Sequence, residues 1–198
     1  MHTHTARGFT LIELLVVLSI ISLIASFVLA GLGSAQKKAR NSTRVQEVAV
    51  YAKAAEAYQV SSRHYPDGGI DWTTAPAYRC LGRTASGATC FGGGYSGDAT
   101  LDQQFALHMS ALAPGRDTGL PLSGYAYRCI ITNAGEPCNQ YTLIYQLEDT
   151  NSKCAGGLVV NASYPTASPN ATYCQIIECA NGKKPVRTGG GGSVYTCN

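Results

Sequence analysis

One carboxylate stands inside a long apolar stretch, and its position limits the chemistry that it can perform. Glu13 is the only ionisable residue between Phe9 and Leu32, where the chain is otherwise mostly Leu, Ile, Val, Ala and Phe. An apolar run of about 20 residues is long enough to cross a bilayer as a helix. A charge at the centre of a bilayer costs about 3 kcal/mol on insertion scales. We therefore expect a positively charged group outside this helix to partner Glu13.

Cysteines are the second group of reactive side chains. The chain has eight, and all of them follow residue 79. Their spacing contains no C-x-x-C pair, which argues against a zinc site. An even number grouped in one soluble region predicts disulfides and an oxidising compartment. The eight are Cys80, Cys90, Cys129, Cys138, Cys154, Cys174, Cys179 and Cys197.

Disulfide connectivity does not follow from the sequence, because eight cysteines allow roughly a hundred pairings. We expect Cys80 and Cys90 to close a small loop and Cys129 and Cys138 to pin a hairpin. The working assignment pairs the cysteines in chain order, as Cys80–Cys90, Cys129–Cys138, Cys154–Cys174 and Cys179–Cys197.

Motifs for enzymatic chemistry are missing. The sequence has no G-x-x-x-x-G-K-[ST] loop and no G-x-S-x-G elbow. Past the first few residues only His64 and His108 remain, too few for most metal or triad sites. Glu148 and Asp149, beside Asn151, offer oxygen ligands to calcium, although a structural turn is the preferred interpretation. We expect no enzyme, no catalytic residue and no bound metal.

The amino-acid composition indicates a folded chain with one segment that is apolar enough to span a membrane. A length of 198 residues suits one domain plus an appendage. Charged residues make up 14% and apolar residues 45%, which argues against intrinsic disorder. The net charge of +3 is small, so bulk charge predicts no nucleic-acid binding.

The block Gly8-Phe9-Thr10-Leu11-Ile12-Glu13, followed by an unbroken apolar helix, resembles the amino terminus of type IV pilins and type II secretion pseudopilins. Residues 1–8 then correspond to a leader peptide. The stretch from Ser34 to Pro66 is similar to the second half of the family's long helix and its exit. Beyond about residue 70 the resemblance is loose. The proline that many pilins carry near the middle of this helix is absent here.

The resemblance implies a role for each matching residue. Gly8 would precede the bond cut by a prepilin peptidase, and Phe9 would become the N-methylated amino terminus. Glu13 would pair with the positive amino terminus of a neighbouring subunit. The chain would form a helical filament with its own copies and other pilins, using a separate assembly ATPase and platform protein. Nucleic acid would be a partner only of a DNA-uptake pilin.

The orientation of the chain in the membrane rests on two opposing signals. Lys37, Lys38, Arg40 and Arg44 follow the apolar run, whereas the leader has only Arg7. Lysine and arginine counts alone would place the larger part in the cytoplasm. The cysteines indicate the opposite side, and the resemblance agrees with them. We expect a single pass of the inner membrane with the head extracytoplasmic, and later a periplasmic or extracellular filament.

The resemblance and the patterns together predict an α+β, pilin-like fold stabilised by disulfides. Residues 9–33 would form the transmembrane or filament-core half of a helix that continues as an amphipathic half over residues 34–61. Residues 62–198 would form the head. The apolar stripe of the amphipathic half has spacings of three and four, with Tyr51 flanking it and Arg44 on the wet side. Its members are Val45, Val48, Ala49, Ala52 and Ala55.

Within the head, β-branched and aromatic residues predict an antiparallel hairpin of residues 125–131 and 141–147. One face of this sheet would cover the amphipathic helix. A further strand is expected at residues 157–160, a short helix at residues 101–112, and a last hairpin of residues 173–179 with 193–197. Residues 70–122 are otherwise expected to form an irregular connection.

Two alternative functions remain open beside a filament subunit. One is a secreted disulfide-rich binding module released after Ala35, and the other is a membrane-tethered enzyme or sensor that never polymerises. Within the filament class, the sequence does not separate a pilus, a secretion pseudopilus and a DNA-uptake filament. Replacement of Glu13 by Ala separates assembly from a tethered activity.

Overall fold

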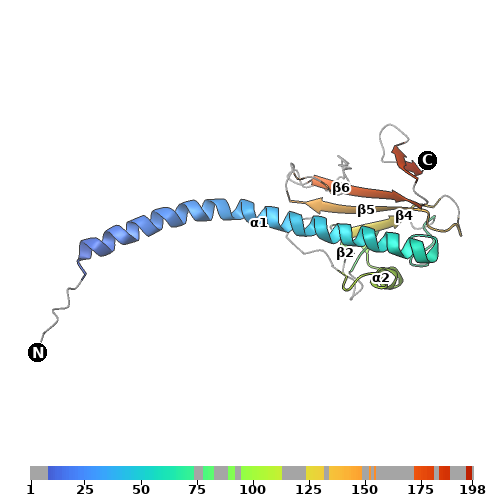
Figure 1. Cartoon of the computed structure of the whole chain (residues 1–198), viewed down its shortest axis with the longest axis horizontal. Helices are drawn as coiled ribbons and strands as arrows, with labels where there is room; N and C mark the ends of the chain where they lie inside the picture. The colour runs from blue at the N-terminus through green and yellow to red at the C-terminus, as the bar shows by residue number, and fades with distance from the viewer. Residues whose placement is uncertain are drawn as a thin grey trace, which may run out of the picture. The chain divides into compact units, whose positions relative to one another are not determined.

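The computed structural model describes residues 9–73, 78–82, 89–91, 95–112, 124–131, 134–148, 152, 154, 172–180, 183–187 and 195–197. The chain divides into two compact units, Met1–Arg40 and Asn41–Asn198. The first unit contains the apolar part of α1 (Leu11–Ser62), and the second contains the remainder of α1 and the sheet. Figure 1 shows α1 as one continuous helix, which confirms the long helix expected from the sequence.

The apolar half of α1 carries three serines that do not interrupt its apolar surface. Each hydroxyl donates to a carbonyl of the preceding turn: Ser19 to Val16 O at 2.7 Å, and Ser22 to Leu18 O at 2.8 Å. The third makes the equivalent bond, from Ser26 to Leu23 O at 2.7 Å. Such back-bonding satisfies the hydroxyls within the helix itself, so this half presents little unsatisfied polarity to an apolar environment.

The carboxyl end of α1 stops at a residue in the left-handed region. Arg63 has φ +65°, and its N–H donates to Gln59 O at 2.8 Å. A glycine usually occupies this position because it has no Cβ to clash. The chain then turns at Gly68, also with φ +65°, where an added Cβ would lie 3.1 Å from Leu101 Cβ.

Replacement of Arg63 by Gly should stabilise the protein by about 0.5–1 kcal/mol, since it removes the Cβ strain of a left-handed residue. For a chain of this size the thermal midpoint should rise by about 2–4 °C per kcal/mol. The R63A variant is the control, because alanine retains a Cβ and gains nothing. A midpoint of R63G no higher than that of R63A would contradict the strain argument. Thermal unfolding of the full chain in detergent measures both.

The head is built on a sheet with strand order β1-β4-β5-β6. The strands are β1 (Arg79–Cys80), β4 (Tyr125–Cys129), β5 (Gln140–Leu147) and β6 (Thr172–Cys179). All pairs are antiparallel, and β5 aligns with β6 over its whole length, from Gln140 opposite Cys179 to Leu147 opposite Thr172. The predicted hairpin is therefore confirmed as β4–β5. The strand expected at residues 157–160 lies outside the described residues.

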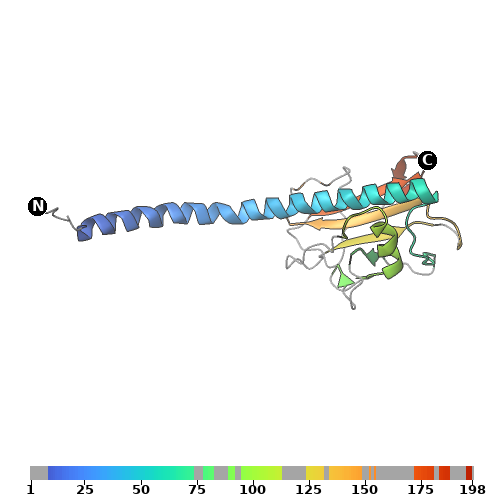
Figure 2. The same ribbon diagram turned by 60° about the horizontal axis from the view of Figure 1, so that its bottom comes forward.

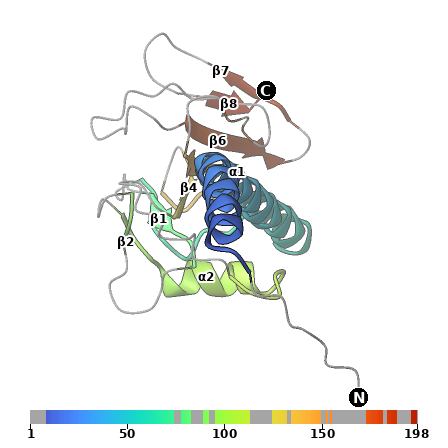
Figure 3. The same cartoon turned by 90° about the vertical axis from the view of Figure 1, so that its left-hand side faces the viewer.

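The prediction for the last hairpin is wrong. β8 (Tyr195–Cys197) pairs with β7 (Pro185–Arg187) and not with β6. The strand β7 has only three residues and begins with Pro, so no run of about four or more strand-forming residues marks it in the sequence. Figure 3 shows β7 and β8 as a small pair beside β6. The carboxyl-terminal strand is nevertheless tied to β6, through the disulfide Cys179–Cys197.

The connection before the sheet is more regular than expected. It contains the short strands β2 (Thr89–Cys90) and β3 (Tyr95–Ser96), which pair, and the helix α2 (Ala99–Ala106). Asp98 caps α2 by accepting a hydrogen bond from Leu101 N at 2.8 Å. The expected helix of residues 101–112 thus begins earlier and ends sooner, and Leu107, which follows α2, is 73% exposed. Figure 2 shows α2 beside the carboxyl end of α1.

Aromatic side chains fill the space between α1, α2 and the sheet. Tyr51 on α1 meets Phe105 on α2 edge-on, with ring centroids 5.5 Å apart, and Phe105 in turn meets Tyr127 at 5.3 Å. The predicted stripe is correct for its buried members Val48 and Ala55. It is wrong for Tyr51, which does not flank the stripe but is completely buried. The ring of Tyr51 is long enough to contact Phe105 on α2 and Tyr125 on β4, which the short side chains of the neighbouring alanines are not.

Candidate functional site

Glu13 lies at the start of α1, where it caps the helix. The Thr10 backbone N–H and hydroxyl both donate to Glu13 Oε2 at 2.8 Å. In return the Glu13 N–H donates to Thr10 Oγ1 at 3.3 Å. This reciprocal arrangement is a capping box of the form T-x-x-E, which satisfies backbone donors at a helix amino terminus. The T-x-x-E spacing of Thr10 and Glu13 is a local sequence signal that predicts this cap.

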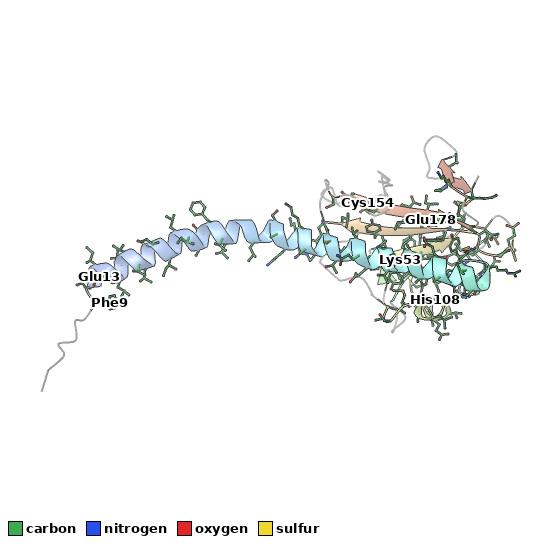
Figure 4. All side chains as sticks on the ribbon, in the orientation of Figure 1. Phe9, Glu13, Lys53, His108, Cys154 and Glu178 are labelled. Carbon is green, nitrogen blue, oxygen red and sulfur yellow. A yellow bond between two sulfur atoms is a disulfide. The ribbon has the colours of Figure 1, made fainter. Side chains whose placement is uncertain are left out.

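The surroundings of Glu13 form an apolar surface groove. Phe9, Ile12, Val16 and Val17 line it together with Glu13. Phe9 is 91% exposed, and Figure 4 shows Phe9 and Glu13 close together at the beginning of α1. A cationic group attached to an apolar residue would complement this groove, because its charge can meet the carboxylate while its apolar part contacts the lining. Gly8 lies outside the described residues.

The apolar half of α1 is uncovered in the single chain. By length and composition, α1 is the one helix among the described residues that qualifies as a membrane span, and its most apolar window is 0% buried. Exposed apolar patches of this size mark surfaces that contact lipid or other protein chains. Its exposed large residues run almost continuously from Phe9 to Leu32.

Four disulfides hold the head together. They join Cys80 to Cys90, Cys129 to Cys138, Cys154 to Cys174 and Cys179 to Cys197. This is the pairing in chain order that we expected. Cys129–Cys138 ties the end of β4 to the segment that leads into β5, and Cys80–Cys90 ties β1 to β2. Disulfides of this kind stabilise small extracytoplasmic domains, typically by about 2–4 kcal/mol each.

The first turn of α1 in the head unit is attached to the end of β5 by a buried polar cluster. Arg44 Nη1 donates to Gln146 O at 3.0 Å, and Arg44 Nη2 lies 3.6 Å from Glu148 Oε1. The side chains of Arg44 and Glu148 are only 7% and 6% exposed. Asn41 adds two hydrogen bonds, accepting from Glu148 N and donating to Ser152 Oγ, both at 2.9 Å.

This cluster corrects the expectation that Arg44 lies on the wet side of the amphipathic half. Periodicity assigned Arg44 to solvent because it is charged, but its partners are distant in sequence. It also bears on the calcium suggestion, since Glu148 is already paired with Arg44. Asp149 and Asn151 lie outside the described residues, and no group of three potential metal ligands occurs among those described.

Buried phenols in the head keep their protons. Burial raises the pKa of Tyr125, and its hydrogen bond to Glu47 raises that pKa further. Burial raises the pKa of Tyr65 to about 12, with additional effects from Glu178 and Glu56. Both tyrosines are therefore neutral near pH 7, and the hydroxyl of Tyr125 donates a hydrogen bond to Glu47.

Among the described residues, the two histidines His64 and His108 do not form a reactive pair. Each ring meets the Tyr58 ring edge-on, with centroid distances of 5.7 Å for His64 and 6.1 Å for His108. His64 Nδ1 is 3.7 Å from Asp67 Oδ2, an interaction that carries charge only when the ring is protonated. Edge-on contacts of this kind are packing interactions, so we assign these residues to the structure of the head.

The architecture defines a class of protein: a chain whose apolar amino-terminal helix continues into an amphipathic half packed on an antiparallel, disulfide-stabilised sheet, as in pilins. A family model described as the prokaryotic N-terminal methylation motif matches residues 3–29. The amino-terminal segment of this chain therefore carries that motif.

One similar protein is type II secretion system core protein G of Escherichia coli (strain K12). It is 36% identical over 64 residues, which cover 32% of this chain and 44% of the relative. The matched region thus spans less than half of the relative's own length. No solved structure matches the chain.

Proposed function

We propose that this chain is a structural, non-enzymatic subunit of a type IV pilus or of a type II secretion-like pseudopilus. The observation that carries the proposal is the methylation motif over residues 3–29, which includes most of the apolar half of α1, a segment that no other described part of the chain buries. The similarity to core protein G supports the same class. No cofactor is required for this role.

The proposed maturation begins with cleavage after Gly8 by a prepilin peptidase. The new amino terminus is Phe9, which is then N-methylated. Before assembly the chain spans the inner membrane once, with leader inside and head outside. A filament of this chain and other pilins then grows with the help of a separate ATPase and platform protein. In the filament, the uncovered apolar surfaces of neighbouring helices pack on one another, which removes them from water or lipid.

Glu13 supplies the register of this packing. A carboxylate removed from water is costly unless an opposite charge compensates it. Cleavage after Gly8 gives each subunit an ammonium group at Phe9, and in a filament the ammonium group of a neighbouring subunit is such a charge. The open apolar groove around Glu13 leaves room for this group to approach. A subunit that slides out of register leaves both charges unpaired, so only one axial position is favoured.

The mature amino terminus tests this proposal directly. The full chain should be expressed with a prepilin peptidase and measured by intact and tandem mass spectrometry. The expected product begins at Phe9 and carries the mass of one added methyl group. A product beginning at Gln36 would instead identify a soluble secreted module.

A control for peptidase activity is needed in the same cells. A prepilin known to be processed by the chosen enzyme should be co-expressed, and G8V should block cleavage of this chain by placing a β-branched side chain at the scissile bond. If the control prepilin is cut while this chain remains uncut at Met1, the membrane-tethered alternative is favoured over the filament subunit.

A further inference from the structure

Two exposed lysines follow the apolar half of α1. Lys37 and Lys38 are adjacent on α1, and both side chains lie in solvent. They belong to a group of four cations that also includes Arg40 and Arg44. Arg44 is buried and paired with Glu148, and Arg40 is half-buried and takes part in another interaction. The two lysines are therefore the members of this group that remain exposed.

Nothing acidic along the chain balances these lysines locally. The sequence contains no Asp or Glu between Glu13 and Glu47. In addition, no ion pair of Lys37 or Lys38 is found in the part of the chain that the structure describes. The positive charges of Lys37 and Lys38 are therefore available to interact with negatively charged groups outside the chain.

The position of the lysines along α1 matches the polar layer of a bilayer. The apolar residues from Leu11 to Leu32 span about 33 Å at 1.5 Å per residue, close to the ~30 Å hydrocarbon core. Lys37 and Lys38 follow about 8 Å beyond Leu32, where the headgroup layer lies. Lysine side chains extend along apolar surface and keep their ammonium groups at this interface.

We propose that Lys37 and Lys38 form a binding surface for anionic phospholipid headgroups, in the leaflet on the side of the head. The inference rests on the membrane-anchored precursor of the proposed function. Lys37 and Lys38 follow the apolar run, where positive charges oppose translocation of the head across the membrane. Phosphate groups of the lipids in that leaflet compensate these positive charges. The lipid contact holds the unassembled subunit at one depth in the membrane, and it is given up when the helix enters a filament.

The test measures which lipids the unassembled chain retains. The full chain is reconstituted in nanodiscs of equal parts phosphatidylglycerol and phosphatidylethanolamine and analysed by native mass spectrometry. The wild type should retain phosphatidylglycerol in preference to phosphatidylethanolamine. The K37Q/K38Q variant should lose this preference by about fivefold per lysine, or roughly 25-fold in total at low ionic strength. High salt should weaken the wild-type preference, because screening shortens the Debye length.

A matched control is available on the same helix. Lys53 is also an exposed lysine of α1, several turns further along on the head unit, as Figure 4 shows. The K53Q variant should keep the wild-type lipid preference. Equal preference in K37Q/K38Q and the wild type, or an equal loss in K53Q, would overturn the proposal. Addition of free inorganic phosphate should not displace the lipid, and displacement would indicate a general anion site instead.

This experiment is independent of filament assembly. It uses a chain that is inserted in a bilayer but has no assembly machinery present. Failure of the chain to polymerise in other assays would leave the lipid preference intact. Conversely, loss of the preference would leave cleavage at Gly8 and methylation of Phe9 unaffected, so the two proposals fail separately.

Discussion

Both E13Q and E13A should reduce filaments to below about a hundredth of the wild-type amount. Removing one member of a desolvated charge pair costs at least ~3 kcal/mol, which corresponds to a factor of more than ~100 for each subunit contact. The variants should be expressed with the complete assembly machinery. Electron microscopy and the amount of chain in the sheared filament fraction then measure assembly.

The comparison of E13Q with E13A separates two roles of this side chain. Glutamine retains an oxygen that accepts hydrogen bonds from Thr10, because either Glu or Gln completes a capping box. It therefore preserves the helix cap that the structure shows and removes only the charge. Normal filaments from E13Q with none from E13A would show that the cap matters and that charge pairing does not.

The cap and the proposed pairing do not compete for the same atom. Both hydrogen bonds from Thr10 reach Oε2 of Glu13, and a carboxylate accepts bonds at both of its oxygens. A neighbouring ammonium group can therefore approach while the cap persists. Cleavage after Gly8 should also leave the cap intact, since its donors belong to Thr10.

Local patterns explain how much of this fold was predictable. An apolar run without proline is sufficient to predict the first half of α1, and β-branched and aromatic runs separated by a turn are sufficient for β4 and β5. In each case the signal and the structure lie within the same short stretch. The capping box at Thr10 has this property too, and it was recognisable from the T-x-x-E spacing.

The error at Arg44 concerns a partner that is remote in sequence. Arg44 was assigned to solvent because nothing nearby indicates Glu148, which lies on another element. The pairing of β8 with β7 was missed for a different reason, because β7 has three residues and begins with Pro, which is too short for a recognisable strand pattern. A periodic pattern identifies a face of a helix, but it does not identify the group that the face will meet.

Among the cationic residues of α1, Arg44 is the one whose replacement should destabilise the head most. The R44M variant keeps side-chain volume but leaves the Glu148 carboxylate buried without its ion-pair partner, and Gln146 O loses a donor. We expect a loss of about 3–5 kcal/mol in the free energy of unfolding. Denaturant unfolding of the oxidised full chain in detergent, followed by tyrosine fluorescence, measures it.

Two further variants test whether the loss of the ion pair between Arg44 and Glu148 causes this destabilisation. K53M makes the same kind of change at an exposed position of α1 and should shift the free energy by less than about 0.5 kcal/mol. R44M/E148M removes both charges, and it should be more stable than R44M because a buried ion pair can be replaced by apolar residues at little cost. If R44M unfolds like K53M, the cluster is not what fastens α1 to the end of β5. If the double variant is as unstable as R44M, lost packing and not an uncompensated carboxylate accounts for the effect.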